Sequence, residues 1–425
     1  MLTQHLTGRT AFAAFALIAC TALPATALAN EHDHHDEHEH EHEHHAHAQD
    51  KRVNPAISLV LNGTYTNLSK DPAQWQISGF VPGGEEVGPG SRGFSLGESE
   101  LTLSAHIDNW LYGALTVAVT PEDEIETEEA FIETTALPGG LRLKAGRFLG
   151  AVGHLNAQHA HTWDFVDAPL THQAFFGGHY RQEGVQGTWR LPTERFIELG
   201  AELGRGSSFP GHDEGSRNGA GAITLTAHTG GELGHSHSWR AGASWLQTRA
   251  QDRPWETTDA FDTEVSNAFT GRSRMWVLDG VWKWAPHGHR GRSFKLQGEY
   301  FRRVESGELN YDLDGASAGP LSDAYRSRQS GWYLQGVYQF APGWRVGLRQ
   351  DRLDPGTVKL AGNSDNLLAS QHAPRRSSVM LDWGPAENQR WRLQLSRDHA
   401  QEGVKDTQVY LQYQVNLGAL RAHSH

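Results

Sequence analysis

Apolar and polar residues alternate with a period of two in many short segments of this chain of 425 residues. Residues 406–417 place Val, Leu, Tyr, Val and Leu on one face, and Gln, Tyr, Gln, Gln and Asn on the other. The same alternation recurs in residues 275–284, 331–340 and 390–396. Successive side chains of a β-strand point to opposite faces, so this period predicts strands with one apolar and one polar face.

Sixteen segments of this kind follow one another along the chain. They cover residues 56–67, 94–108, 110–120, 124–136, 139–148, 183–191, 195–204, 219–230, 237–250, 273–285, 291–304, 329–341, 343–352, 376–384, 389–399 and 406–418. Short turns alternate with long connections, which are residues 68–93, 149–182, 205–218, 251–272, 305–328 and 353–375. This alternation of loop lengths is typical of an outer-membrane β-barrel. Counts of fourteen or eighteen strands stay open, because two segments are weaker predictions: the segment 124–136 is rich in acids, and the segment 183–191 is short.

Strands, not helices, have to cross the membrane in this interpretation. After residue 30, no stretch approaches the roughly 20 apolar residues that a membrane helix needs. A barrel strand needs only about 9–11 residues, and closure leaves no unpaired sheet edge in lipid. A soluble sandwich would also alternate, but the many strands and the Trp and Tyr residues at their ends favour a barrel. We therefore predict an all-β fold, a transmembrane antiparallel β-barrel of about 16 strands.

The N-terminal residues match a secretory signal peptide. Arg9 supplies a positive charge, residues 11–19 form a short apolar run, and residues 27–29 form an Ala-Leu-Ala cleavage motif. Residues 17–20 also resemble a lipoprotein box, so lipidation of Cys20, the only cysteine, stays open. Cleavage after residue 29 would leave a mature chain without a thiol, which excludes a disulfide or a cysteine metal site.

The chain then divides into a signal peptide (1–29), a tail (30–50) and a barrel (51–425). In the tail, residues 31–49 read EHDHHDEHEHEHEHHAHAQ, which is too polar for a packed core, so we expect disorder. Dense imidazoles bind zinc, copper or nickel with little geometric demand. The candidate metal ligands are His32, His34, His35, His38, His40, His42, His44, His45 and His47. The alternative is a solvated spacer with incidental affinity.

The charge balance argues against nucleic acid as a partner. The chain has 37 basic and 50 acidic residues, a net charge of −13. Eight acids lie in residues 31–50 and one base, Arg9, precedes them, so residues 51–425 carry 36 basic and 42 acidic residues, or −6. Nucleic-acid binding needs clustered positive charge, which this balance does not supply.

Residues 97–150 carry a family resemblance in the segments GESELTLSAHIDNWLYGALTVAV and EEAFIETTALPGGLRLKAGRFLG. They resemble the phosphate-selective (O and P type) porin superfamily. More narrowly, residues 54–68, 93–101 and 154–170 resemble proteins labelled zinc-regulated outer-membrane receptors. The resemblance implies a pore-forming barrel, a third long loop that folds into the lumen, and zinc as a ligand or solute.

The third connection on the external side, residues 149–182, combines histidines with carboxylates, which suit zinc and similar ions. We name His154, His159, His161 and Asp164 as candidate metal ligands in this loop. Asp167, His172 and His179 lie nearby in the sequence. The alternative is a polar loop whose histidines hydrogen-bond its own backbone.

Alternation also predicts which charged residues face the lumen. The candidate pore-lining residues are Arg142, Lys144, Lys283, Lys295, Arg345, Arg349, Arg392, Glu98 and Glu100. Further inward charges are expected at Arg240, Arg303, Arg390, Glu198, Glu202, Asp279, Glu299 and Asp382. Opposed charges across a pore create a transverse field that filters solutes. The alternative is that these are paired charges of the kind that line any water-filled barrel.

No phosphate-binding loop, nucleophile elbow or HExxH motif occurs, so we do not expect an enzyme. We expect a porin-like channel for passive uptake of small solutes, with divalent metal ions such as zinc foremost. A general or anion-selective porin with an incidental tail, and a non-conducting metal-binding protein, are the alternatives. No tightly bound cofactor is expected beyond zinc as a ligand or solute.

The resemblance also sets expectations for location and partners. We expect the bacterial outer membrane, with both termini in the periplasm because the strand count is even. The expected partners are outer-membrane lipid and lipopolysaccharide, the barrel-assembly machinery, and metal ions or small solutes. Barrels of sixteen strands commonly form trimers, so a homotrimer is a candidate assembly.

Overall fold

The computed structural model describes residues 55–81, 83–84, 87–120, 124–212, 218–286 and 291–418. The predicted signal peptide and the tail with its nine candidate metal ligands lie outside the described residues. No helix within these ranges is long and apolar enough to cross a membrane.

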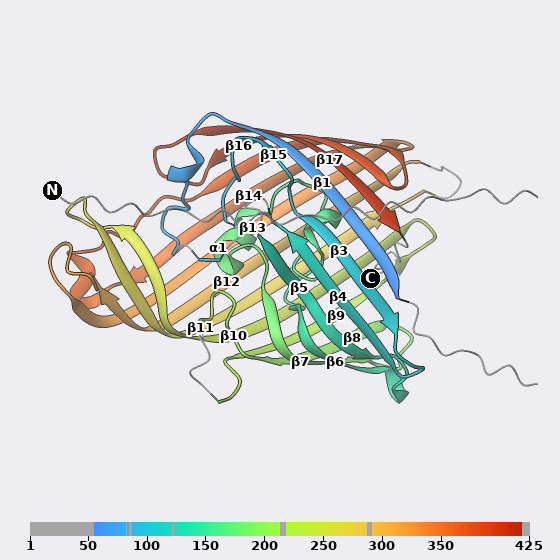
Figure 1. Cartoon of the computed structure of the whole chain (residues 1–425), viewed down its shortest axis with the longest axis horizontal. Helices are drawn as coiled ribbons and strands as arrows, with labels where there is room; N and C mark the ends of the chain where they lie inside the picture. Colours follow the sequence, from blue (N-terminus) through green and yellow to red (C-terminus); the bar gives the residue numbers. More distant parts are fainter. Residues whose placement is uncertain are drawn as a thin grey trace, which may run out of the picture. The chain divides into compact units, whose positions relative to one another are not determined.

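The described residues form one closed antiparallel sheet (Figure 1). Its strands are β1 (Ala56–Leu68), β2 (Gly93–Ser95), β3 (Ser99–His106), β4 (Leu111–Val119), β5 (Ile125–Thr134), β6 (Leu141–Leu149), β7 (Arg181–Arg190), β8 (Phe196–Gly204), β9 (Ala222–Leu233), β10 (His237–Thr258), β11 (Glu264–Trp284), β12 (Ser293–Tyr311), β13 (Leu321–Ala341), β14 (Trp344–Lys359), β15 (Arg375–Ala386), β16 (Gln389–His399) and β17 (Asp406–Gly418). Strand β17 pairs with β1 and closes the barrel. Strands β2 and β3 both pair with β1 and share one position in the wall. The predicted barrel of sixteen antiparallel strands is therefore confirmed.

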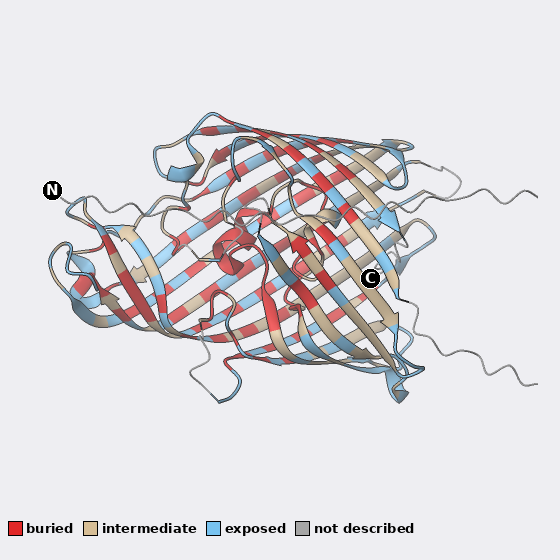
Figure 2. Ribbon diagram, viewed as in Figure 1, coloured by how far each residue is buried: buried red, intermediate tan, exposed pale blue. Residues whose placement is uncertain are grey.

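Side chains alternate between the two faces of the wall as the sequence predicts (Figure 2). In β16, Arg392 and Gln394 point inward and are 2% and 0% exposed. Leu393 and Leu395 point outward and are 42% and 46% exposed. An apolar outer face and a polar inner face suit a barrel that is surrounded by lipid.

Two connections that we predicted as long loops, residues 251–272 and 305–328, are largely strand, and so is the first part of a third, residues 353–359. These residues extend β10 to β14 beyond the end of the other strands (Figure 1). In these extensions the pattern is inverted, because apolar residues such as Phe269, Tyr311 and Tyr325 point inward and form a buried cluster. The outer face is polar there, which hides the strands from a search for apolar outer faces.

Between β6 and β7 the chain turns into the barrel. This connection, residues 150–180, is called loop 3 below and contains the helix α1 (Leu170–Phe176). All seven residues of α1 are buried. Gly177 ends the helix in the left-handed conformation, with φ of 69°, where a side chain would be strained. Loop 3 contacts inward-facing residues of β3 and β5 and, across the lumen, of β12 and β14, so it lies inside the barrel.

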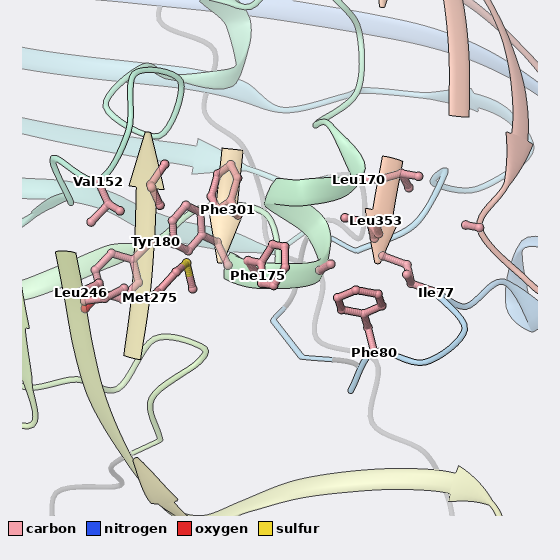
Figure 3. Packing of buried hydrophobic residues seen from close by; sticks show 14 residues of the cluster. Ile77, Phe80, Val152, Leu170, Phe175, Tyr180, Leu246, Met275, Phe301 and Leu353 are labelled. Atoms are coloured by element: carbon pink, nitrogen blue, oxygen red, sulfur yellow. The ribbon is translucent and has the colours of Figure 1, made fainter. Parts of the chain in front are cut away.

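Part of the barrel interior is filled by apolar side chains. Phe175 of α1 and Tyr180 pack with Leu246, Met275 and other residues of the wall (Figure 3). The rings of Phe175 and Phe301 stack with centroids 5.5 Å apart, and both side chains are fully buried. Each such side chain contributes roughly 1.5–3 kcal/mol by leaving water. This apolar cluster holds the middle of loop 3 against β10 to β14.

Candidate functional site

Three carboxylates gather on the inner face of the wall, from Glu100 of β3 and from Glu128 and Glu129 of β5. Neighbouring residues of a strand normally point to opposite faces. Here Glu129 pairs with Thr116 while Thr127 pairs with Val117, so Glu128 is the extra residue of a β-bulge. A bulge re-aims one side chain, and both glutamates therefore face the lumen.

His159 of loop 3 lies among these three carboxylates. Its Nδ1 atom is 3.0 Å from Glu128 Oε2 and 3.3 Å from Glu100 Oε2, and its Nε2 atom is 2.9 Å from Glu129 Oε2. His161 stacks beside it, with ring centroids 5.7 Å apart, and its Nδ1 atom is 2.7 Å from Glu100 Oε1. These five residues are called the His–Glu cluster below.

The cluster keeps the His159 imidazole charged. Burial alone would lower its pKa, but the hydrogen bonds that both ring nitrogens donate to Glu100, Glu128 and Glu129 outweigh burial. Together they raise the pKa of His159 well above its usual value. Its positive charge therefore balances part of the negative charge on the wall.

The same atoms have the arrangement and chemistry of a metal site. The ligand atoms of Glu100, Glu128 and His159 all lie within 4.8 Å of one another. One imidazole nitrogen and carboxylate oxygens are ligands that zinc accepts. An ion would first have to displace the proton of His159, so its affinity would rise with pH. Arg181 lies 3.1 Å from Glu128 and competes for the same carboxylate, which favours weak binding.

The opposite wall is basic, and loop 3 presents acids to it. Asp164 lies 3.1 Å from Arg345 and also contacts Lys295. Burial would raise the pKa of Asp164, but Lys295 and Arg345 lower it to about 2. Asp167 lies 2.7 Å from Arg349 and 2.9 Å from Arg376.

Glu299 of β12 holds the two ends of the loop together. It accepts a hydrogen bond from the backbone N–H of Leu155 at 2.9 Å and another from the backbone N–H of His154. Its second oxygen lies 2.7 Å from Nε2 of His172, and the side chains of both residues are 0% exposed. A buried carboxylate needs such donors, so Glu299 fixes the position of loop 3.

The structure separates the four ligands that we predicted in loop 3. His159 and His161 come together, and they meet Glu100, which we predicted as a pore-lining residue. Asp164 points to the basic wall instead. The ring of His154 lies against Gln158, and burial is the main cause that lowers its pKa to about 3. His154 and Asp164 are therefore not members of the cluster.

The sequence analysis missed Glu128 and Glu129. A strict period of two cannot place both on the lumen side, because the bulge is invisible to alternation. The signal available in the sequence was the pair of adjacent acids, Glu128 and Glu129, in an otherwise alternating strand.

The predicted pore-lining residues all lie on inward-facing positions. Some lie on parts of the wall that loop 3 leaves uncovered, and the others lie beneath loop 3. Arg142 and Lys144 each lie 3.6 Å from Glu133, and Lys283 pairs in register with Lys295. Loop 3 covers the others to a larger extent. The residues beneath it are Glu100, Lys295, Arg345, Arg349 and Arg392, and Glu98 adjoins the cluster through Glu128.

A closed sixteen-stranded wall with an inserted third loop defines a porin-like barrel, and solved structures agree on this fold. The anion-selective porin from Comamonas acidovorans has a TM-score of 0.52 and 11% identity, and covers 86% of this chain and 100% of that chain. A loop L8 deletion mutant of OmpT, an outer membrane protein of Vibrio cholerae, has a TM-score of 0.52 and 9% identity, with 86% and 99% covered. The outer membrane channel DcaP of Acinetobacter baumannii has a TM-score of 0.50 and 11% identity, with 86% and 97% covered.

A relative in sequence places the chain in a family. An uncharacterized protein of Aquifex aeolicus (strain VF5) is 30% identical over 392 residues, which cover 87% of this chain and 79% of the relative. The chain belongs to the family of that protein. No family model matches the sequence.

Proposed function

We propose that the protein is an outer-membrane channel for the passive uptake of small solutes, and that divalent metal ions such as zinc are its preferred solutes. The observation that carries the metal part is the His–Glu cluster, in which a loop inside the lumen places His159 between Glu128 and Glu129. The resemblance to the O and P type porins supports the channel, and the resemblance to the zinc-regulated group supports zinc as its solute.

Conduction sets a limit on such a site, because an ion that enters must also leave. The cluster meets that limit, since His159 and Arg181 already neutralise part of its charge. A closed cage of four ligands would hold zinc too tightly for transport. The histidine-rich tail would serve as a second low-affinity ligand for ions in the periplasm.

The wider setting follows from the same proposal. The barrel lies in the bacterial outer membrane with both termini in the periplasm, and lipid, lipopolysaccharide and the barrel-assembly machinery are its partners. A homotrimer is the assembly that we propose for it. The protein acts as a channel and catalyses no reaction.

Two observations favour other functions. Lys283 and Lys295 are cross-strand neighbours on the lumen side, and such a basic pair favours an anion-selective pore. The apolar cluster around Phe175 fills part of the interior, which favours a barrel that binds metal without conducting.

Single-channel conductance in planar bilayers separates these functions. The full mature chain, a chain lacking residues 30–49 and the variant Glu128→Gln/Glu129→Gln would be measured with and without micromolar zinc. We expect a steady conductance that zinc reduces, and we expect the double variant to lose this effect. The variant Glu198→Gln is a control, because it removes an inward carboxylate outside the cluster.

Each of the other outcomes selects a different function. Conductance that is indifferent to zinc would leave a general porin, and a reversal potential that favours anions would identify the anion-selective form. A barrel that binds zinc but carries no current would be the non-conducting alternative.

A further inference from the structure

The outer face of the barrel carries a row of arginines at one level. Each of the seven consecutive strands from β10 to β16 has an exposed arginine on its outward face, toward the end of the barrel from which loop 3 enters. We call these residues the arginine belt: Arg249, Arg274, Arg302, Arg328, Arg352, Arg375 and Arg397.

The belt lies where the apolar outer surface ends. Arg302 pairs in register with Trp276, and Arg352 pairs with Trp332. Toward the other end of the barrel, the outward positions are apolar, as at Leu348, which is 64% exposed. Aromatic residues followed by cations mark the boundary between hydrocarbon and headgroups.

The belt has no counter-ions of its own. None of its seven guanidinium groups forms an ion pair with a carboxylate in the described part of the chain; the side chain of Arg274 hydrogen-bonds Gln247 instead. The inward arginines differ, since Arg345 and Arg376 each contact aspartates.

Two outward-facing arginines on the other side of the barrel do have a carboxylate partner, in contrast to those of the belt. Arg147 and Arg205 also point outward near the same end, and they lie 3.2 Å and 3.4 Å from Glu183. Farther around, the outward positions at this end are apolar residues such as Phe94 and Ile125. In the described part of the chain, the row of outward arginines without a carboxylate partner therefore follows the arc from β10 to β16.

A bound anion would stabilise this arc. Arg352 and Arg375 lie directly opposite each other on neighbouring strands, and like charges in that position destabilise a sheet. Guanidinium groups bind phosphate through two parallel hydrogen bonds, which makes phosphate the matching ligand. The apolar surface directly beside the belt offers a place for acyl chains.

We propose that the arginine belt binds the phosphate groups of a phosphorylated glycolipid of the lipopolysaccharide type in the outer leaflet. This inference rests on the proposed outer-membrane location. Its acyl chains lie along the apolar band of β10 to β16, and its phosphates lie between arginines of neighbouring strands. The belt thereby gives one arc of the barrel a fixed shell of lipid.

The test measures binding of bis-phosphorylated lipid A to the full chain in detergent, by native mass spectrometry and by titration. In the variant Arg302→Gln/Arg352→Gln/Arg375→Gln we expect affinity to fall at least about tenfold, because three charge-assisted phosphate contacts are lost. The control Arg147→Gln/Arg205→Gln should change affinity less than about twofold, since Glu183 already neutralises those groups. The triple Arg→Lys variant should lie between wild type and the triple Gln variant, because lysine keeps the charge but cannot form the two parallel hydrogen bonds. Heat-modifiable migration on gels checks that each variant is folded.

Two further ligands distinguish the source of the phosphate. Dephosphorylated lipid A should bind at least about tenfold more weakly than the bis-phosphorylated form. Inorganic phosphate at the same phosphate concentration should not displace lipid A, and displacement would show a site for free phosphate and overturn the lipid assignment. Unchanged lipid A binding in a folded triple Gln variant would also overturn it. Neither result depends on conductance or on zinc, so it leaves the proposed channel function to its own experiment.

Discussion

Glu128 and Glu129 are neighbours in the chain, yet their carboxylates contact the two different ring nitrogens of His159, at 3.0 Å and 2.9 Å. The bulge in β5 makes this arrangement possible, because it turns both side chains toward the lumen. The fit between wall and loop therefore depends on one extra residue in one strand.

The His–Glu cluster predicts that Glu128 and Glu129 are each needed for zinc binding in the barrel. In a chain that lacks residues 30–49, so that the tail does not contribute, Glu128→Gln or Glu129→Gln should weaken zinc binding about tenfold or more. Isothermal titration at pH 7.5 measures the affinity. Glu133→Gln is the matched control on the same strand, because Glu133 pairs with Arg142 and Lys144 instead. Equal affinity in all four proteins would exclude the cluster as the metal site.

Asp164 predicts that acid loosens loop 3. Its pKa falls from 3.8 to about 2 in the folded protein, so its contribution to stability is present above pH 4 and is lost as the pH falls toward 2. The shift corresponds to about 2 kcal/mol. Hydrogen exchange of residues 150–180 should therefore stay slow from pH 7 to pH 4, after correction for the intrinsic rates, and quicken below. In Asp164→Asn the exchange should be faster at pH 7 and lose most of this pH dependence; a wild-type profile in the variant would contradict the assignment.

The contacts of Glu299 predict that its substitution displaces loop 3 more than the loss of the Asp164 charge does. Glu299→Gln removes the carboxylate that contacts the backbone N–H groups of His154 and Leu155 and the ring of His172, and each hydrogen bond to a charged group is worth about 1.5–3 kcal/mol. Limited proteolysis should then cut loop 3 while the barrel still migrates as a folded species. Tyr300→Phe is the control, since Tyr300 is the next residue of β12 and points outward. If protease leaves loop 3 of the Gln variant intact, Glu299 does not hold the loop.

The apolar cluster predicts that loop 3 can loosen without the wall. Phe175→Ala removes a fully buried ring and should cost about 3–5 kcal/mol. Exchange of the amides of α1 should accelerate, while amides of β15 to β17, which do not contact Phe175, should stay protected. Phe94 is 90% exposed, so Phe94→Ala should change neither rate. Faster exchange of every strand in Phe175→Ala would show that loop and wall unfold as one unit.

The sequence predicts the wall better than the site, for a physical reason. Lipid requires an apolar outer face, so strands such as β16 and β17 are predicted to the residue. Beyond the apolar band that requirement ends and the pattern inverts, as at Phe269 of β11, so the extensions are missed.

The candidate site could also be predicted only in part from the alternation of apolar and polar residues. His159 and His161 are visible as an isolated pair in a long loop, but their partners lie about 30 and 60 residues earlier. Local alternation contains no information about which wall a loop will meet, and it cannot show the bulge at Glu128.

The attachment points of loop 3 also fix the order in which the molecule can assemble. His161 contacts Glu100 of β3, whereas Val166 binds Gln394 of β16, and these strands are separated along the chain by most of the barrel. Both sides of the loop can be satisfied only after β16 has been made and β17 has joined β1. Contacts between distant parts of a chain form slowly. The contacts of loop 3 with β3 and β5 can form early, whereas its contacts with β16 need almost the whole wall, so the loop can be fully docked only late in folding.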